Sequence, residues 1–188
     1  MLTKAKRNRY NSFCLFGVIA MKVNIKDLAA SGHPLTVKEE LDVSGLLQER
    51  EGISAKGMLS VDLIARTEKG LTVVEGTLSL PVEMPCSRCL TPIRETLTVP
   101  FRELFALRPE IIPKEEQDEV HVLTEDHIML EPYVLEAFWL ALPYAPVCGE
   151  DCKGLCPTCG KNRNTEACGC GNDRIDPRMA GLADFFKT

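Results

Sequence analysis

Apolar and polar residues alternate most clearly in the middle of the chain, where they predict an antiparallel sheet. Residues 58–66 and 71–82 are rich in β-forming side chains. They are separated by residues 67–70, a turn sequence that ends in a glycine able to adopt positive φ. Residues 93–101 place apolar side chains on one face and arginine and threonine on the other, as in a half-buried strand. We therefore predict three adjacent antiparallel strands.

The first part of the chain predicts shorter elements. Residues 21–25 resemble the opening of a strand, and residues 31–34 contain turn-forming residues. A second extended run covers residues 35–43, and residues 45–52 predict a loop with a short helical turn.

The strongest helical pattern covers residues 132–142. Pro132 suits the first turn of a helix, where its missing N–H has no intrahelical partner. Apolar side chains cover nearly every side, which predicts a helix buried all round. A second helix is predicted to start at Asp176, ahead of Pro177. The fold class expected from these elements is α+β, with an antiparallel β-rich body, a buried helix and a small C-terminal module.

Charge is distributed unevenly along the 188 residues. The formal net charge is −5, but residues 1–20 hold four basic residues and no acid, so the remainder carries −9. A body this acidic disfavours a general phosphate-coating surface. Eight acids against one lysine lie within residues 109–131, which predicts a solvated loop around a short strand at residues 120–123. The alternative is a docking patch for a basic partner protein.

Three regions are expected from these patterns. Residues 1–20 are interpreted as a start codon assigned too early or a disordered arm, with a cleaved secretory signal as the least favoured alternative. Residues 21–146 form the β-rich body, and residues 147–188 form a cysteine-rich metal-binding module with a terminal helix. No apolar stretch approaches the roughly 20 residues of a membrane span, and a cytoplasmic protein is expected. The oligomeric state stays open.

Cysteines are concentrated near the C-terminus. The candidate ligands there are Cys148, Cys152, Cys156, Cys159, Cys168 and Cys170. Cys156 and Cys159 belong to a Cys-Pro-Thr-Cys-Gly sequence, in which two thiolates can converge on one ion and the glycine frees backbone N–H groups to face them. The other four cysteines offer more than enough ligands to complete a tetrahedral zinc site, so the small C-terminal module is predicted to be a zinc-knuckle module. An iron–sulfur cluster, a redox-active Cys-x-x-Cys pair and a disulfide module are weaker alternatives.

A second pair, Cys86 and Cys89, lies in a tight connection between two predicted strands. These two residues either complete the same site from a distance, supply half of a second site, or pack as plain buried thiols. The spacing leaves open which four sulfurs bind and whether there are one or two ions. All three histidines (His33, His121 and His127) are far from the cysteines in sequence, so an all-thiolate zinc would be structural rather than catalytic.

Taken together, these motifs resemble the YceD family, the large ribosomal RNA subunit accumulation proteins of bacteria and plastids. The resemblance rests on Cys-x-Arg-Cys-Leu at residues 86–90, the acidic stretch, and the Leu-Ala-Leu-Pro helix end at residues 140–143. It also rests on the tail motifs at residues 152–162, 168–170 and 176–178. It implies a non-enzymatic role in 23S rRNA accumulation during large-subunit assembly, with no active site to transfer. Family members begin near Met21.

Two routes could link an acidic protein to a ribosomal precursor particle. Basic residues around the cysteines could contact rRNA phosphates, or the acidic body could bind a basic ribosomal protein. The candidate contact residues are Arg88, Lys153, Lys161, Arg163, Arg174 and Arg178. The alternative is that these residues are solvated or neutralise neighbouring acids. A different class of function, a thiol redox or metal-handling protein using Cys156 and Cys159, is the competing hypothesis.

Overall fold

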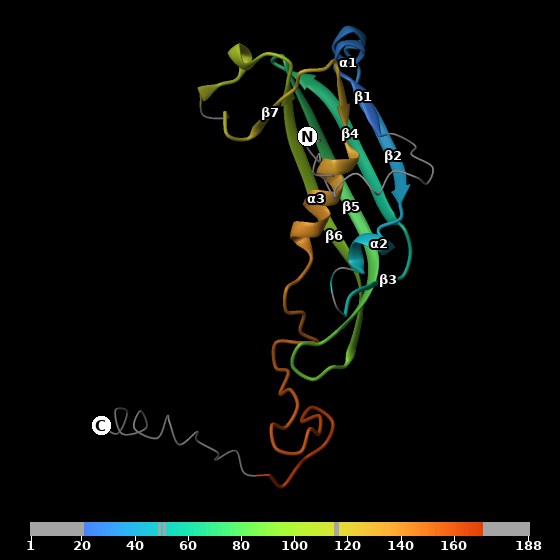
Figure 1. Cartoon of the computed structure of the whole chain (residues 1–188), viewed down its shortest axis with the longest axis vertical. Coiled ribbons are helices and arrows are strands. Elements are labelled where there is room, and N and C mark those ends of the chain that lie inside the picture. Colours follow the sequence, from blue (N-terminus) through green and yellow to red (C-terminus); the bar gives the residue numbers. More distant parts are fainter. Residues whose placement is uncertain (1–20, 49, 51, 115–116, 171–188) are drawn as a thin grey trace, which may run out of the picture.

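Three long strands form the centre of the structure, and shorter elements extend or cover them (Figure 1). The computed structural model describes residues 21–48, 50, 52–114 and 117–170. The strands are β1 (Lys22–Asn24), β2 (Leu35–Leu41), β3 (Ser54–Ala55), β4 (Leu59–Glu68), β5 (Leu71–Pro85), β6 (Pro92–Ala106), β7 (Val120–Val122) and β8 (His127–Met129). The helices are α1 (Ile25–Ser31), α2 (Ser44–Leu47), α3 (Glu131–Ala141) and the 3-10 turn η2 (Pro109–Ile111).

The strands form two sheets. The larger has the order β2-β4-β5-β6-β7, with β3 also paired to β5, and the smaller consists of β1 and β8. Antiparallel pairing prevails, as predicted, and the pair β6–β7 is parallel. β3, β8 and this parallel edge were not predicted, because their two- and three-residue strands are too short to show a period.

Strand β4 shows why the sequence forms a one-sided sheet. Leu59, Val61, Leu63 and Ala65 are buried, while the residues between them face away from the core. The predicted turn to β5 is confirmed, with Lys69 at φ 51° and Gly70 at φ 88°. Strand β6 continues the predicted strand of residues 93–101 in both directions, so that β5 and β6 pair along fourteen positions.

Close backbone contact fixes the middle of this sheet at Gly76. Gly76 pairs with Leu63 of β4 on one side and with Phe101 of β6 on the other. A Cβ atom at position 76 would lie 2.1 Å from the Asp62 carbonyl oxygen and 2.9 Å from the Leu63 Cα atom. Both are backbone atoms held in the sheet, so only glycine lets β4 and β5 approach this closely.

Helix α3 packs against the sheet through one face only. In Figure 1 it crosses the strands, and the chain then runs down to the cysteine-rich segment. Val134 and Phe138 are fully buried among the core side chains, whereas Leu140 is 76% exposed. The prediction of a helix buried all round is therefore wrong. Helix α3 carries more apolar side chains than the sheet can cover, so one stripe of the helix faces outward.

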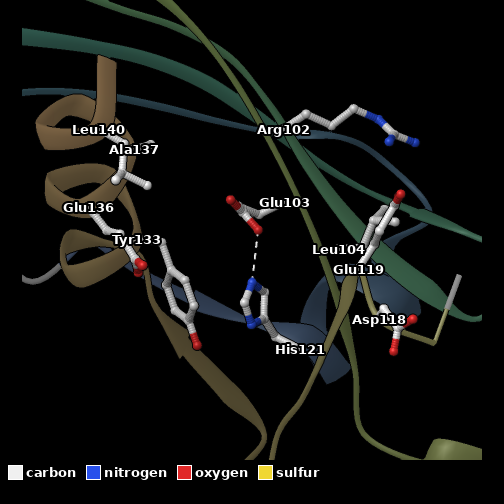
Figure 2. Close-up of a pocket in the computed structure, with 10 residues that line it drawn as sticks. All are labelled: Arg102, Glu103, Leu104, Asp118, Glu119, His121, Tyr133, Glu136, Ala137 and Leu140. Atoms are coloured by element: carbon white, nitrogen blue, oxygen red, sulfur yellow. Dashed lines mark hydrogen bonds and ion pairs between the residues drawn. The ribbon is translucent and has the colours of Figure 1, made fainter. Parts of the chain in front are cut away.

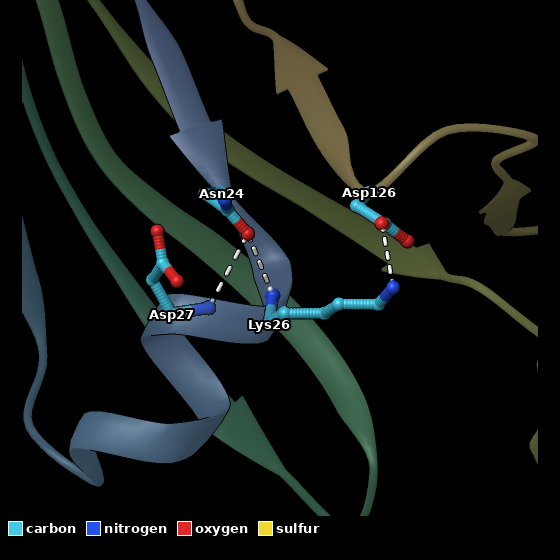
Figure 3. Close-up of polar contacts among 4 residues, drawn as sticks. All are labelled: Asn24, Lys26, Asp27 and Asp126. Atoms are coloured by element: carbon cyan, nitrogen blue, oxygen red, sulfur yellow. Dashed lines mark hydrogen bonds and ion pairs between the residues drawn. The ribbon is translucent and has the colours of Figure 1, made fainter.

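The structure also contains α1 where the sequence predicted only a strand followed by a turn. The side chain of Asn24 caps the helix, accepting hydrogen bonds from the N–H groups of Lys26 and Asp27 at 3.0 and 3.3 Å (Figure 3). Lys26 also pairs with Asp126 at 2.6 Å, which links α1 to the chain before β8 (Figure 3). With only two buried residues, α1 is too short for a helical period to be recognised.

The acidic stretch forms more structure than a solvated loop. The predicted strand near residues 120–123 is present as β7, and β8 follows it. Ile112 and Val120 lie in a small second core with side chains from β5 and β6. Within the described residues, no helix is long and apolar enough to cross a bilayer. The predicted helix starting at Asp176 and the interpretation of residues 1–20 lie outside the described residues.

Candidate metal centre

One cysteine tetrad joins the β5–β6 connection to the chain that follows α3. Cys86 and Cys89 come from the connection, and Cys148 and Cys152 from the later segment. The Sγ atoms of Cys86 and Cys152 are 3.8 Å apart, and those of Cys89 and Cys148 are 3.5 Å apart. All four Sγ atoms lie within 4.8 Å of one another. We call this group the bridging tetrad.

A second group lies wholly within residues 147–170, which we call the tail. It comprises Cys156, Cys159, Cys168 and Cys170, and all four Sγ atoms lie within 4.8 Å of one another. We call it the tail tetrad. Its local framework is a small hairpin in which the Cys156 N–H donates to the Lys161 carbonyl at 2.8 Å. The Gly160 N–H donates back to the Cys156 carbonyl at 2.8 Å, and Gly160 has φ 74°, a conformation that favours glycine.

The spacing of the sulfurs matches a single tetrahedral ion. Four thiolates at about 2.3 Å from one zinc ion lie about 3.8 Å from one another, and the two measured pairs of the bridging tetrad are 3.8 and 3.5 Å apart. A disulfide would bring two sulfurs to about 2.05 Å, and all eight described cysteines are free thiols. The spacing in each tetrad is therefore compatible with binding one metal ion.

Each tetrad combines a readily ionised thiol with one that resists ionisation. Burial raises the pKa of Cys86, but N–H groups of Cys148, Cys89 and Arg88 outweigh it and bring the pKa to about 6. The N–H groups of Cys159 and Thr158 lower the pKa of Cys156 to about 6 as well.

The resisting thiols are Cys148 and Cys170, and the pKa of each is raised to about 12. For Cys148 the main cause is contact with the sulfur of Cys89, and for Cys170 it is contact with the sulfur of Cys159. Four thiolates so close together repel one another, so full ionisation of either tetrad requires a cation at its centre.

Arg88 connects the two segments that carry the bridging tetrad. Its guanidinium donates to the carbonyl oxygens of Glu150 and Cys152 at 3.4 and 3.3 Å. Its own carbonyl accepts from the Leu155 N–H at 2.9 Å. Gly154 fits tightly here, because a Cβ atom at that position would lie 3.1 Å from the Arg88 carbonyl oxygen. These contacts tie Arg88 to the later cysteine segment, while the residue itself stays exposed, so its predicted contact with RNA or a partner stays a prediction.

Two asparagines between the tetrads were not predicted as site residues. Asn164 accepts from the Lys153 N–H at 2.8 Å and approaches the Cys152 Sγ with its amide nitrogen at 3.4 Å. Asn162 donates to the hydroxyl of Thr91, which in turn lies 3.2 Å from the Cys89 Sγ. They hold the tail hairpin against the bridging tetrad. In the sequence, the only indication of a role for these asparagines was their position shortly after the Cys156–Cys159 motif.

The basic residues predicted to contact RNA or a partner lie at different places. Lys153 and Arg163 are exposed and line a cavity of about 230 Å³ beside the tail tetrad. Lys161 pairs with Glu166 at 3.2 Å, so its charge is partly neutralised. Arg174 and Arg178 lie outside the described residues.

The predicted ligand residues thus divide in a way that the spacing had left open. The partners of Cys156 and Cys159 are Cys168 and Cys170. Cys148 and Cys152 belong to the other group. Cys86 and Cys89 provide half of the other group. The geometry corresponds to two sites of four sulfurs each, the arrangement that the sequence offered as one of its alternatives.

Comparison with known proteins adds the family. Residues 74–186, which contain both tetrads and most of the central sheet, match the family described as large ribosomal RNA subunit accumulation protein YceD. The chain belongs to the YceD family. The resemblance noted in the sequence is thereby confirmed. No solved structure matches this YceD chain.

Several relatives of this YceD protein come from bacteria. An uncharacterised protein of Mycobacterium tuberculosis is 38% identical over 136 residues, covering 71% of this chain and 65% of the relative. One from Mycobacterium leprae is 36% identical over 171 residues, covering 90% of this chain and 71% of the relative. A plant relative, the chloroplastic YCED homolog 1 of Arabidopsis thaliana, is 24% identical over 154 residues, covering 68% of this chain and 47% of the relative. The aligned part thus spans about 65% of the length of the first relatives.

Proposed function

We propose that this protein is a non-enzymatic factor that supports 23S rRNA accumulation and assembly of the large ribosomal subunit in the cytoplasm. The observation that carries the proposal is the YceD family match across residues 74–186. The Arabidopsis relative bears the name of a large ribosomal RNA subunit accumulation protein. The partner is a ribosomal precursor particle, bound through rRNA or a basic ribosomal protein.

We further propose one structural zinc ion in each tetrad. Four sulfurs with no histidine or carboxylate leave no open position for a substrate, which is typical of structural rather than catalytic zinc. A mononuclear ion also suits the sulfur spacing better than an iron–sulfur cluster, in which the sulfurs bind different irons and must lie farther apart. The zinc of the bridging tetrad would join the sheet to the tail.

Counting metal ions tests the two-site proposal. We expect about two zinc ions and negligible iron per chain in protein purified under reducing conditions, measured by plasma mass spectrometry with native mass spectrometry. Cys152→Ser and Cys168→Ser alter different tetrads, so each should lower the zinc content by about one. The exposed Ser60→Ala on β4, away from both tetrads, is a control that should leave the count unchanged. Retention of both ions in either cysteine variant would contradict the assignment.

Depletion tests the cellular role. Cells depleted of the protein should show a lower ratio of 23S to 16S rRNA and fewer complete large subunits in sucrose gradients. Expression of the wild-type chain should restore both, and the Cys152→Ser variant should restore them poorly, because the tail would no longer be joined to the sheet. An unchanged rRNA ratio with normal subunit profiles would contradict the proposal.

The competing function is thiol redox or metal handling through Cys156 and Cys159. It is favoured by the pKa of Cys156, lowered to about 6 by the N–H groups of Cys159 and Thr158, because a thiolate is the reactive form. Metal-free protein that forms a Cys156–Cys159 disulfide rapidly and reversibly would support it. Protein that retains zinc and protects these thiols from alkylation would support the structural role instead.

A further inference from the structure

A groove far from the cysteines lies between α3 and the β6–β7 edge of the sheet. Its volume is about 380 Å³, and it opens to solvent. Figure 2 shows the side chains that line it. Tyr133, Glu136, Ala137 and Leu140 line it from α3. Their spacing places them on one side of the helix, separate from Val134 and Phe138, which pack into the core. The groove therefore occupies the helix stripe that the sheet leaves uncovered.

Aromatic rings form a fixed wall in the groove. His121 of β7 lies 2.8 Å from a carboxylate oxygen of Glu103 (Figure 2). The rings of His121 and Tyr133 have centroids 4.7 Å apart, and Tyr133 meets the buried Phe105 edge-on at 5.0 Å. This packing holds the tyrosine ring at the groove surface, where a cationic group can stack on it. Leu140, 76% exposed, adds an apolar contact at the end of the stripe.

The charge of the groove is strongly negative. Glu103, Asp118, Glu119 and Glu136 all line it, against a single cationic residue, Arg102. The Arg102 side chain points away from the Glu103–His121 pair (Figure 2). Its positive charge also contributes, after Arg66, to lowering the pKa of Glu75, which does not line the groove. The groove thus repels phosphate and attracts cations.

We infer that this groove is a docking site for an arginine-rich segment of a partner protein that also carries apolar side chains. A guanidinium can pair with the carboxylates of the groove while stacking on Tyr133. An apolar side chain beside it would cover Leu140. The chemistry of this site is independent of the proposed ribosomal function. Only the identification of the partner as a basic ribosomal protein rests on that function.

The test uses the full zinc-bound chain and a short fluorescein-labelled peptide of alternating arginine and leucine. Binding is followed by fluorescence anisotropy at low and high salt, because rim ion pairs weaken with salt. A peptide with glutamine in place of arginine measures the contribution of charge. The variant Asp118→Lys/Glu136→Lys reverses two groove charges. The matched control Glu40→Lys/Glu110→Lys changes the net charge equally at exposed acids outside the groove.

We expect the arginine peptide to bind and the glutamine peptide to bind far more weakly. Reversing the two groove charges should weaken binding by about tenfold or more, and the matched control by about twofold at most. Leu140→Ser should weaken binding several-fold, whereas Met58→Ser, at an exposed apolar residue elsewhere, should not. Circular dichroism should show every variant folded, since the replaced side chains are largely exposed.

Three results would overturn the inference. They are failure of the arginine peptide to bind at low salt, equal weakening by the two double variants, and preferential binding of a labelled single-stranded RNA at the groove. Loss of peptide binding in the groove variant together with an unchanged 23S to 16S ratio in cells would support the docking site while separating it from the ribosomal role. A changed ratio with normal peptide binding in the cysteine variants would bear on the proposed function alone.

Discussion

In strand β4, four of ten side chains are buried, whereas in the whole of residues 147–170 only Gly154 and Cys156 are buried. Burying one leucine or valine contributes about 1.5–3 kcal/mol, so the sheet and its helix can form a core without help. The tail has almost no apolar surface to bury. A structural zinc ion contributes about 10–16 kcal/mol of apparent binding free energy in small peptides, which is enough to order such a segment. Exclusion of water holds the sheet together, whereas the proposed zinc ions, bound by the two cysteine tetrads, would order the tail.

The largest effect is expected in the sheet, from Gly76→Ala. The added Cβ atom would overlap the Asp62 carbonyl oxygen at 2.1 Å, and neither strand can move without breaking its pairing. We expect a loss of about 3 kcal/mol or more in the free energy of unfolding, measured by urea denaturation. Gly57→Ala is the matched control, because its Cβ atom would make ordinary contacts at 3.8 Å. Equal stability of the two variants would show that the sheet accommodates a side chain at position 76.

A local effect, confined to the tail and smaller for the protein as a whole, is expected from removing metal. A strong chelator or acidification should release zinc, because protons compete with metal for the thiolates. Amide hydrogen exchange should then rise steeply in residues 147–170 and change little in β4 and β5. The control is exchange in the zinc-bound protein without chelator at the same pH. Loss of protection throughout the sheet at the same chelator concentration would mean that the two regions do not stabilise themselves independently.

The smallest effect is expected from Arg88→Ala. Its guanidinium contacts to the carbonyls of Glu150 and Cys152 orient the segment that carries two sulfurs of the bridging tetrad. Residues that support metal ligands typically change metal affinity by about 10–100-fold, and we expect the lower end because these contacts are exposed. Competition with a colorimetric chelator measures the change. Arg94→Ala, which removes an exposed pair with Glu83, should leave zinc affinity unchanged.

The elements predicted from sequence were those with a repeated local pattern. The β-rich composition of residues 58–66 and the alternation in residues 93–101 predicted strands β4 and β6, and the turn at residues 67–70 was visible from its glycine. Helix α1 was missed because its two buried residues and the Asn24 cap carry too little signal. The exposure of Leu140 was missed because an apolar helix does not show how much of its surface the sheet covers.

The cysteines illustrate the same limit at the candidate site. The spacing of Cys156 and Cys159 indicated their pairing, because a separation of two intervening residues is a local property of the sequence. The grouping of Cys86 with Cys152 depends on where the chain returns after α3, and no local pattern specifies that. Asn162 and Asn164 likewise acquire their roles only when the tail folds back beside Thr91 and Cys152.

The bridging tetrad joins residues 86 and 152, which are 66 positions apart, whereas the tail tetrad spans residues 156–170. Because closing a long loop costs more entropy than closing a short one, the two centres should mature in sequence. When the full chain refolds, the tail centre could load as soon as residues 156–170 close on themselves. The bridging centre must wait until the β5–β6 hairpin and α3 have brought its halves together. Pulsed thiol labelling during refolding should therefore show Cys159 protected before Cys89. Loading of the bridging centre would then report that the sheet has been completed.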